Sequence, residues 1–263
     1  HPGTYIGKGK IDEVNDLLYG TDATGIVCDD ELSPAQISNL EEALDTKVMD
    51  RTLIILDIFA KRAFTREGKI QVELAQLKYR ASKLTGQGRA LSRLGGGIGT
   101  RGPGEKKLEM DRRLIRTRIS RLKAELRDVV KHREVQRKQR QKNHLPVVCI
   151  VGYTNAGKST LLNHFTNAGV YEEDQLFATL DPTTKSLDLS GGQTILMTDT
   201  VGFIRKLPHH LVEAFKSTLE EAKYSDLILH VVDASNPQKE KQMEAVYDTL
   251  KQLGANESPI ITA

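Results

Sequence analysis

Eight residues at 152–159, G-Y-T-N-A-G-K-S, constrain the fold of this chain more than any other feature. They match the phosphate-loop pattern G-x-x-x-x-G-K-[ST] at every required position. The apolar run V-V-C-I-V at 147–151 precedes the loop and predicts a buried strand, while T-L-L-N-H-F after it predicts a helix. A strand, a glycine-rich loop and a helix in this order are typical of a parallel α/β sheet. We therefore expect a P-loop domain over residues 144–263.

The loop also predicts its own chemistry. Its backbone N–H groups should surround the β-phosphate of a nucleoside triphosphate, with the following helix dipole in support. Lys158 should reach the β- and γ-phosphates, and the Ser159 hydroxyl should coordinate Mg²⁺. The predicted loop residues are Gly152, Tyr153, Thr154, Asn155, Ala156, Gly157, Lys158 and Ser159.

A second motif follows in the right order. The strand-like run T-I-L-M-T at 194–198 ends in D-T-V-G, residues Asp199, Thr200, Val201 and Gly202. An Asp at a strand end in this class holds the Mg²⁺ shell, and the Gly202 amide should contact the γ-phosphate. Between the motifs lies F-A-T-L-D at 177–181, followed by P-T-T. One threonine of this stretch should close over Mg²⁺ in the triphosphate state, as switch loops do.

Residues 1–64 alternate helix and strand signals and predict a small α/β domain with a few parallel strands. Residues 24–28 and 47–50 are the expected strands, and Ser33-Pro34 should begin a helix as its N-cap and first-turn proline. The two cysteines lie in predicted strands, which favours buried reduced thiols and a cytoplasmic protein.

Residues 65–143 have a different pattern. Apolar residues recur at heptad-like spacing in two series, Ile70, Leu74, Leu77, Ala81, Leu84, Leu91 and Ile115, Ile119, Leu122, Leu126, Val129. Between them, L-G-G-G-I-G-T-R-G-P-G at 94–104 cannot sustain a helix. We expect an antiparallel helical hairpin with a glycine-rich tip, because each helix can bury its apolar side against the other.

The hairpin is strongly basic. Residues 78–142 hold 21 Lys and Arg against 6 Asp and Glu, a net charge of +15, while the rest of the chain carries −12. Such a block predicts a polyanion-binding element, although a merely solvated hairpin is the alternative. The tip could instead cradle a nucleotide phosphate or be unstructured, but its charge favours RNA over both. The predicted RNA contacts are Arg93, Arg101, Lys106, Lys107, Arg112 and Arg113.

Together these motifs resemble the HflX GTPases of the Obg-HflX group. The most specific part of the likeness is G-G-x-G-x-R-G-P-G-E-x-x-L-E-x-D-R-R at 96–113, and the resemblance covers essentially the whole chain. It implies an N-terminal α/β domain, a helical hairpin and a Ras-like GTPase domain that is incomplete at its C-terminus. It also implies GTP, GDP and Mg²⁺ as ligands, and a role at the large ribosomal subunit in splitting or rescuing stalled ribosomes.

The resemblance suggests Thr179 as the Mg²⁺ ligand of switch I, with Thr183 and Thr184 as alternatives. It places Phe177, Ala178, Thr179, Leu180 and Asp181 at the nucleotide. Phe203 occupies the position where many Ras-like GTPases have a water-orienting Gln, so we expect slow hydrolysis that a partner accelerates. The guanine-reading N-K-x-D motif is expected near Ala263, so GTP specificity rests on the resemblance.

Other functions remain open at this stage. An antibiotic-resistance protein that protects ribosomes, a non-ribosomal RNA-remodelling NTPase, or a scaffold that hydrolyses nothing could share these features. The expected partner is the large subunit and its ribosomal RNA, without DNA, and the protein is expected to be a monomer. The sequence holds no apolar run of about 18 residues, so no membrane span is predicted.

Overall fold

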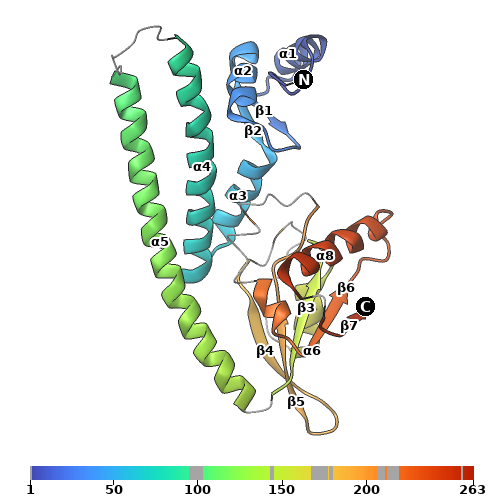
Figure 1. Cartoon of the computed structure of the whole chain (residues 1–263). Coiled ribbons are helices and arrows are strands. Elements are labelled where there is room, and N and C mark those ends of the chain that lie inside the picture. Colours follow the sequence, from blue (N-terminus) through green and yellow to red (C-terminus); the bar gives the residue numbers. More distant parts are fainter. Residues whose placement is uncertain are drawn as a thin grey trace. The chain divides into compact units, whose positions relative to one another are not determined.

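A computed structural model of the chain (Figure 1) describes the backbone of residues 2–94, 103–142, 145–166, 177, 180–205, 211, 219–255 and 257–263. The side chains of 85–94, 103–107 and 136–142 fall outside this description. The chain forms two compact units. The first unit contains His1–Asp57 and Glu73–Ala124, and the second unit contains Ile58–Val72 and Glu125–Ala263.

The first unit begins with a small α/β arrangement. Helix α1 spans Lys8–Thr21, strand β1 Gly25–Cys28, helix α2 Pro34–Leu44, strand β2 Lys47–Asp50 and helix α3 Arg51–Arg62, whose last residues belong to the second unit. Strands β1 and β2 pair in parallel, as the sequence predicted. Ser33 accepts a hydrogen bond from the Gln36 amide and forms a full capping box, which confirms the predicted start of α2.

Apolar side chains hold this arrangement together. Leu32, Leu40, Leu44 and Val48 form a buried cluster between α2 and the strands. Burying a leucine side chain contributes roughly 1.5–3 kcal/mol, so this cluster is sufficient to fix a small helix on two strands.

Helices α4 (Arg66–Leu94) and α5 (Pro103–Lys142) are the two helices that the heptad-like series predicted. In the first unit, Arg118 of α5 binds Glu73 of α4 through two contacts of 2.7 and 2.9 Å. Further along, Arg112 Nη2 donates to the Leu84 carbonyl at 2.7 Å. A later residue of α4 thus meets an earlier residue of α5, so the helices run antiparallel. The glycine-rich tip lies outside the described residues.

The second unit is built on a five-stranded sheet in the order β4-β5-β3-β6-β7. Its strands are β3 (Val147–Gly152), β4 (Thr183–Asp188), β5 (Thr194–Asp199), β6 (Leu227–Val231) and β7 (Ile260–Thr262). The pairs β3–β5, β3–β6 and β6–β7 are parallel, and β4 is antiparallel to β5. This is the parallel α/β sheet that the phosphate loop predicted, with one antiparallel edge strand.

Helices α6 (Lys158–Thr166) and α8 (Lys239–Leu253) pack on this sheet and both contact β3. Ile150, Leu162 and Met197 form the centre of the core. Cys149 is fully buried and Cys28 is partly buried, and both are free thiols. Within the described ranges, no helix combines the length and the apolar character needed to cross a bilayer.

Candidate nucleotide-binding site

The phosphate loop connects β3 directly to α6. Strand β3 ends at Gly152 and helix α6 begins at Lys158. Asn155 and Gly157 have positive φ angles of 60° and 90°, and such left-handed residues turn successive backbone N–H groups toward one side. Gly152 is required by close approach, because a Cβ there would collide with the Val231 carbonyl of β6. Gly152 and Gly157 therefore allow the backbone conformation that the phosphate-loop motif predicted.

Lys158 lies at the bottom of this loop. Its side chain is only 6% exposed, and Nζ donates to the Tyr153 carbonyl at 2.9 Å. Burial lowers the pKa of Lys158 to about 8, although nearby Asp199 opposes the shift. Desolvation disfavours the charged ammonium, so a phosphate anion entering the loop would replace lost hydration. A buried ammonium at this position is therefore suited to bind an anion.

Ser159 and Asp199 meet beside Lys158. The Ser159 hydroxyl donates to Asp199 Oδ2 at 2.7 Å, and Asp199 is fully buried at the end of β5. Parallel pairing puts Asp199 opposite Ile150 in β3, so the two motifs share one edge of the sheet. Hydroxyl and carboxylate oxygens are the hard donors that Mg²⁺ prefers, and this pair fits the ion.

The D-T-V-G segment is fixed to the phosphate loop by its backbone. The Thr154 amide donates to the Phe203 carbonyl at 2.7 Å, and the Phe203 amide donates to the Gly152 carbonyl at 3.0 Å. Thr200 is buried and donates from Oγ1 to the Ile150 carbonyl at 2.8 Å. A Cβ on Gly202 would lie 2.6 Å from Thr154 Cα and 3.1 Å from Lys158 Nζ. Only glycine can therefore approach the phosphate loop and Lys158 this closely.

Phe203 and Val201 are buried next to this glycine. Phe203 is 2% exposed, and its ring carries no polar atom that could hydrogen-bond water. In the phosphate loop itself, Thr154 is buried, Tyr153 and Ala156 are partly buried and Asn155 is exposed. The Tyr153 hydroxyl accepts a hydrogen bond from the Arg205 amide at 3.2 Å.

The F-A-T-L-D segment is described at three of its five residues, and Ala178 and Thr179 lie outside the description. Phe177 is 2% exposed and donates from its amide to Thr154 Oγ1 at 2.9 Å. Leu180 is also buried. The Asp181 carboxylate binds backbone amides of Phe64 and Thr65 at the start of α4, an interaction that sequence reasoning missed.

The two alternative switch threonines lie on β4. Thr184 Oγ1 hydrogen-bonds Thr198 Oγ1 at 2.9 Å, so it takes part in strand pairing. Thr183 stands opposite Asp199 in the antiparallel register. Of the two, Thr183 is therefore the one that lies opposite Asp199.

The predicted RNA contacts are only partly described. Arg112 is half-buried and donates a hydrogen bond from a guanidinium nitrogen to the Leu84 carbonyl, while Arg113 is exposed. The side chains of Arg93, Arg101, Lys106 and Lys107 lie outside the described residues.

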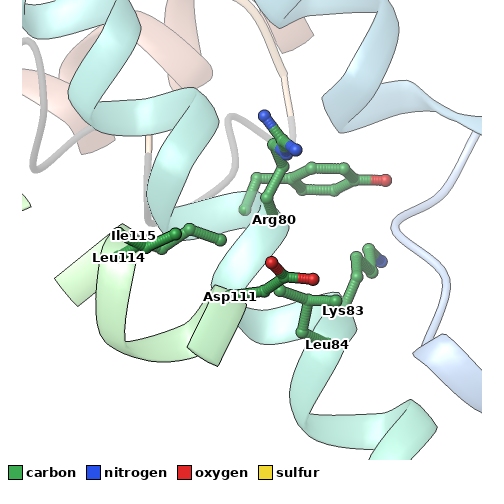
Figure 2. Close-up of a pocket in the computed structure, with 7 residues that line it drawn as sticks. Arg80, Lys83, Leu84, Asp111, Leu114 and Ile115 are labelled. Atoms are coloured by element: carbon green, nitrogen blue, oxygen red, sulfur yellow. The ribbon is translucent and has the colours of Figure 1, made fainter. Parts of the chain in front are cut away.

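The first unit also contains a pocket of about 460 Å³ on α4 and α5 (Figure 2). Arg80, Lys83 and Leu84 line it from α4, and Asp111, Leu114 and Ile115 from α5. Lys83 already binds Asp50 at 3.2 Å, and the lining mixes both signs of charge. The pocket is remote in sequence from the phosphate loop and contains none of its residues.

A parallel sheet whose central strand leads into a phosphate loop, and whose neighbour ends in D-x-x-G, defines a P-loop GTPase domain. Family models agree along the chain: "GTP-binding GTPase N-terminal" matches residues 1–60, "GTP-binding GTPase Middle Region" 62–140, and "50S ribosome-binding GTPase" 147–263. The chain belongs to the HflX family of GTPases.

Curated relatives agree with this assignment. The chain is 74% identical over 262 residues to a GTPase HflX of Lacrimispora saccharolytica, covering all of this chain and 62% of that protein. It is 51% identical to the GTPase HflX of Escherichia coli K12, covering 99% of this chain and 61% of that protein. The chain thus spans about three-fifths of the length of these relatives.

A solved structure shares the fold. The crystal structure of an SsGBP and GDP complex is 27% identical, with a TM-score of 0.52, over the whole of this chain and 70% of that one. That protein is bound to GDP in the crystal, which fits a phosphate loop in the equivalent fold.

Proposed function

We propose that this protein binds GTP with Mg²⁺ and hydrolyses it to GDP and phosphate. The observation that carries the proposal is the group formed by Lys158, Ser159, Asp199 and Gly202. The buried Lys158 ammonium lies next to Gly202, at a distance that only glycine permits, and a hydroxyl–carboxylate pair of 2.7 Å lies beside it. Phosphates, Mg²⁺ and a γ-phosphate sensor require these groups in this arrangement.

Each residue of the site has a distinct task. Lys158 binds the β- and γ-phosphates, and Ser159 and Asp199 hold Mg²⁺, directly or through its water shell, with Thr179 as the third residue from switch I. When bound, the ion would neutralise negative charge on the phosphates. The Gly202 amide binds the γ-phosphate, so its hydrogen bond is lost when that phosphate leaves.

Guanine is the base supported by the family. The relatives are named as GTPases, and the similar solved structure contains GDP. Competition of labelled GTP with unlabelled ATP and GTP on the intact protein tests this directly. Equal competition by ATP would contradict guanine specificity.

Intrinsic hydrolysis should be slow. The residue after Gly202 is Phe203, and its ring is buried in place of a glutamine that could hold the attacking water. A partner must therefore order the water or the switch loops. We assign this role to the large ribosomal subunit, because the chain carries a +15 block and its GTPase domain matches the model described as a 50S ribosome-binding GTPase.

The switch works by differential affinity. GTP orders the switch loops and favours the ribosome-binding state, and hydrolysis favours release. Splitting or rescue of stalled ribosomes is the task that this cycle would serve.

Binding to purified large subunits tests the cycle. The protein is incubated with subunits and either a non-hydrolysable GTP analogue or GDP, and the bound fraction is measured after sedimentation. We expect strong binding with the analogue and weak binding with GDP. Lys158→Ala should bind alike in both conditions, because it cannot hold the phosphates. Equal affinity of the unmodified protein in the two nucleotide states would contradict the switch.

A further inference from the structure

The buried side of helix α3 carries an aromatic ring near its C-terminal end. Ile55, Leu56 and Phe59 recur at helical spacing, and each is 4% exposed or less. The Phe59 ring meets the Phe177 ring edge to face, with centroids 4.7 Å apart and ring planes at 75°. Aromatic pairs prefer this geometry, because the positive edge of one ring points at the negative face of the other. Helix α3 therefore holds a residue of a distant segment through a specific contact.

Phe177 has an unusual backbone conformation. Its φ angle is 56°, in the left-handed region that bulky residues rarely adopt. Such a conformation costs free energy and persists only where the surroundings enforce it. Here the ring is 2% exposed and packs against Phe59, and the amide donates to Thr154 Oγ1 at 2.9 Å. The side chain and the backbone of Phe177 are thus fixed by two different elements, α3 and the phosphate loop.

Thr154 is the residue at which this contact reaches the phosphate loop. It is 6% exposed, and its amide donates to the Phe203 carbonyl at 2.7 Å. The next residue, Asn155, has the positive φ angle that turns the backbone N–H groups of the loop toward one side. Thr154 is therefore held twice, by the D-T-V-G-F segment through its backbone and by Phe177 through its hydroxyl.

These contacts form a continuous path from α3 to the phosphate loop. We call its three residues, Phe59, Phe177 and Thr154, the aromatic anchor. All three belong to the second unit. Because the Phe177 ring is buried against α3, its described contact with the loop is the amide hydrogen bond. A change at Phe59 can therefore reach the loop through the Thr154 hydroxyl.

We propose that Phe59 is a positioning residue for the phosphate loop, which it supports through Phe177 and Thr154. The proposal rests on the proposed function, since it takes this loop as the nucleotide site. A loop whose N–H groups are already aligned loses less conformational freedom when phosphates bind, so the anchor raises nucleotide affinity. The loop surrounds the β-phosphate, which GTP and GDP both contain. The anchor should therefore favour both nucleotides to the same extent.

Coupling of this kind is reciprocal. If the anchor favours nucleotide binding, a bound nucleotide must stabilise the anchor by the same free energy. The Phe177 amide should therefore exchange its hydrogen more slowly with GDP bound than in the nucleotide-free protein. Equal exchange rates in the absence of nucleotide and at saturating GDP would contradict the coupling.

Thr154→Val and Thr154→Ser test the hydroxyl. Affinities of the intact protein for fluorescent GDP and GTPγS, both with Mg²⁺, are measured for each variant. Valine has nearly the shape of threonine but cannot accept the hydrogen bond from Phe177. We expect it to weaken both nucleotides about fivefold, the net contribution of one hydrogen bond. Serine keeps the acceptor and should recover most of this loss, so a serine variant as weak as the valine variant would overturn the proposal.

Phe59→Leu tests the remote end of the anchor. Leucine keeps an apolar side chain in the buried position but removes the ring that meets Phe177. We expect both nucleotides to bind about threefold more weakly, in line with the loss of one aromatic pair. Phe64→Leu is the matched control, because it is the same substitution on a ring that is 71% exposed just after α3. The control should leave both affinities unchanged, and urea unfolding establishes that each variant is folded.

A double-mutant cycle separates the anchor from a general effect on folding. If Phe59 acts through Thr154, Phe59→Leu should have little further effect on nucleotide affinity in a Thr154→Val background. Full additivity, unchanged affinities in Phe59→Leu or a loss for GTPγS alone would each overturn the proposal. If Phe59→Leu does not fold, the comparison of Thr154→Val with Thr154→Ser decides it. Unchanged variants of a chain that binds both nucleotides leave the proposed function intact, whereas an unmodified chain that binds neither overturns both.

Discussion

Gly202 and Phe203 are neighbours with opposite environments. Gly202 lies against the phosphate loop and Lys158, where a Cβ would not fit, while the Phe203 side chain is buried and its backbone is hydrogen-bonded to the phosphate loop. In the site that we propose, the motif D-T-V-G-F supplies Gly202 to the nucleotide and Phe203 to the core. A single substitution at each position can test these two roles separately.

Gly202→Ala should impair triphosphate binding. The added Cβ would lie 2.6 Å from Thr154 Cα, a backbone atom that cannot move without distorting the loop. We expect GTPγS affinity to fall at least tenfold, about 1.4 kcal/mol, with a smaller effect on GDP, measured by fluorescence titration. Gly191→Ala is the control, because a Cβ there meets nothing within 4 Å. Unchanged GTPγS affinity in Gly202→Ala would exclude the γ-phosphate role.

Phe203→Gln should not create a faster enzyme. The position is 2% exposed, so the new amide would be buried rather than aimed at water. Leaving a buried amide without partners costs roughly 1–3 kcal/mol, in addition to the lost packing of the ring. We expect a lower melting temperature and no increase in phosphate release without ribosomes. Faster intrinsic hydrolysis would instead show that this side chain reaches the attacking water.

At the scale of elements, one buried carboxylate joins three parts of the first unit. Asp50 ends β2 and is fully buried. It accepts hydrogen bonds from the Leu53 amide at 3.0 Å, the Tyr79 hydroxyl at 2.9 Å and Lys83 Nζ at 3.2 Å. Strand β2, helix α3 and helix α4 therefore meet at the Asp50 carboxylate. Burial, together with the nearby Asp50 charge, raises the pKa of Tyr79.

Asp50→Ala should destabilise this unit strongly. Removing one member of a buried ion pair leaves Lys83 without its carboxylate and costs about 3–5 kcal/mol. Tyr79→Phe removes a single hydrogen bond and should cost about 1 kcal/mol. Asp29→Ala is the control, because Asp29 is 85% exposed in its ion pair with Arg51. Its loss should lower the free energy of unfolding by less than about 1 kcal/mol. Urea unfolding measures the free energy of unfolding of all three variants. Similar losses of stability for Asp50→Ala and Asp29→Ala would contradict the idea that burial makes the Asp50 contacts important.

The elements themselves were largely predictable, since their signals are local. Ser33-Pro34 marked the start of α2, and the strand before Gly152 marked the central strand of the sheet. The site residues Lys158, Ser159 and Asp199 were predicted because their motifs have fixed spacing, and the structure brings them together. Contacts between distant segments were not predictable. Asp50 with Tyr79 and Asp181 with Thr65 depend on tertiary packing, and no periodicity or motif in one sequence reports a long-range hydrogen bond.

At the scale of the whole molecule, the charge distribution is the dominant feature. The chain has a net charge of only +3, yet residues 78–142 carry +15. Within the block, 6 acidic residues accompany 21 basic ones, and Arg118 pairs with Glu73, which lies outside it. A concentrated positive block attracts polyanions at long range and makes binding sensitive to salt.

The salt dependence of ribosome binding tests whether the block contacts phosphates. Each phosphate neutralised by a Lys or Arg releases counterions and adds to the slope of log K against log salt concentration. Arg113 is exposed on α5, so Arg113→Ala should lower affinity for large subunits and reduce that slope by about one. Lys8→Ala, an exposed lysine of α1 outside the block, is the control and should leave the slope unchanged. Sedimentation at several salt concentrations with a GTP analogue gives both slopes. If Arg113→Ala and Lys8→Ala have equal slopes, Arg113 does not contact phosphate, and the positive charge at this position serves only as a solvated surface.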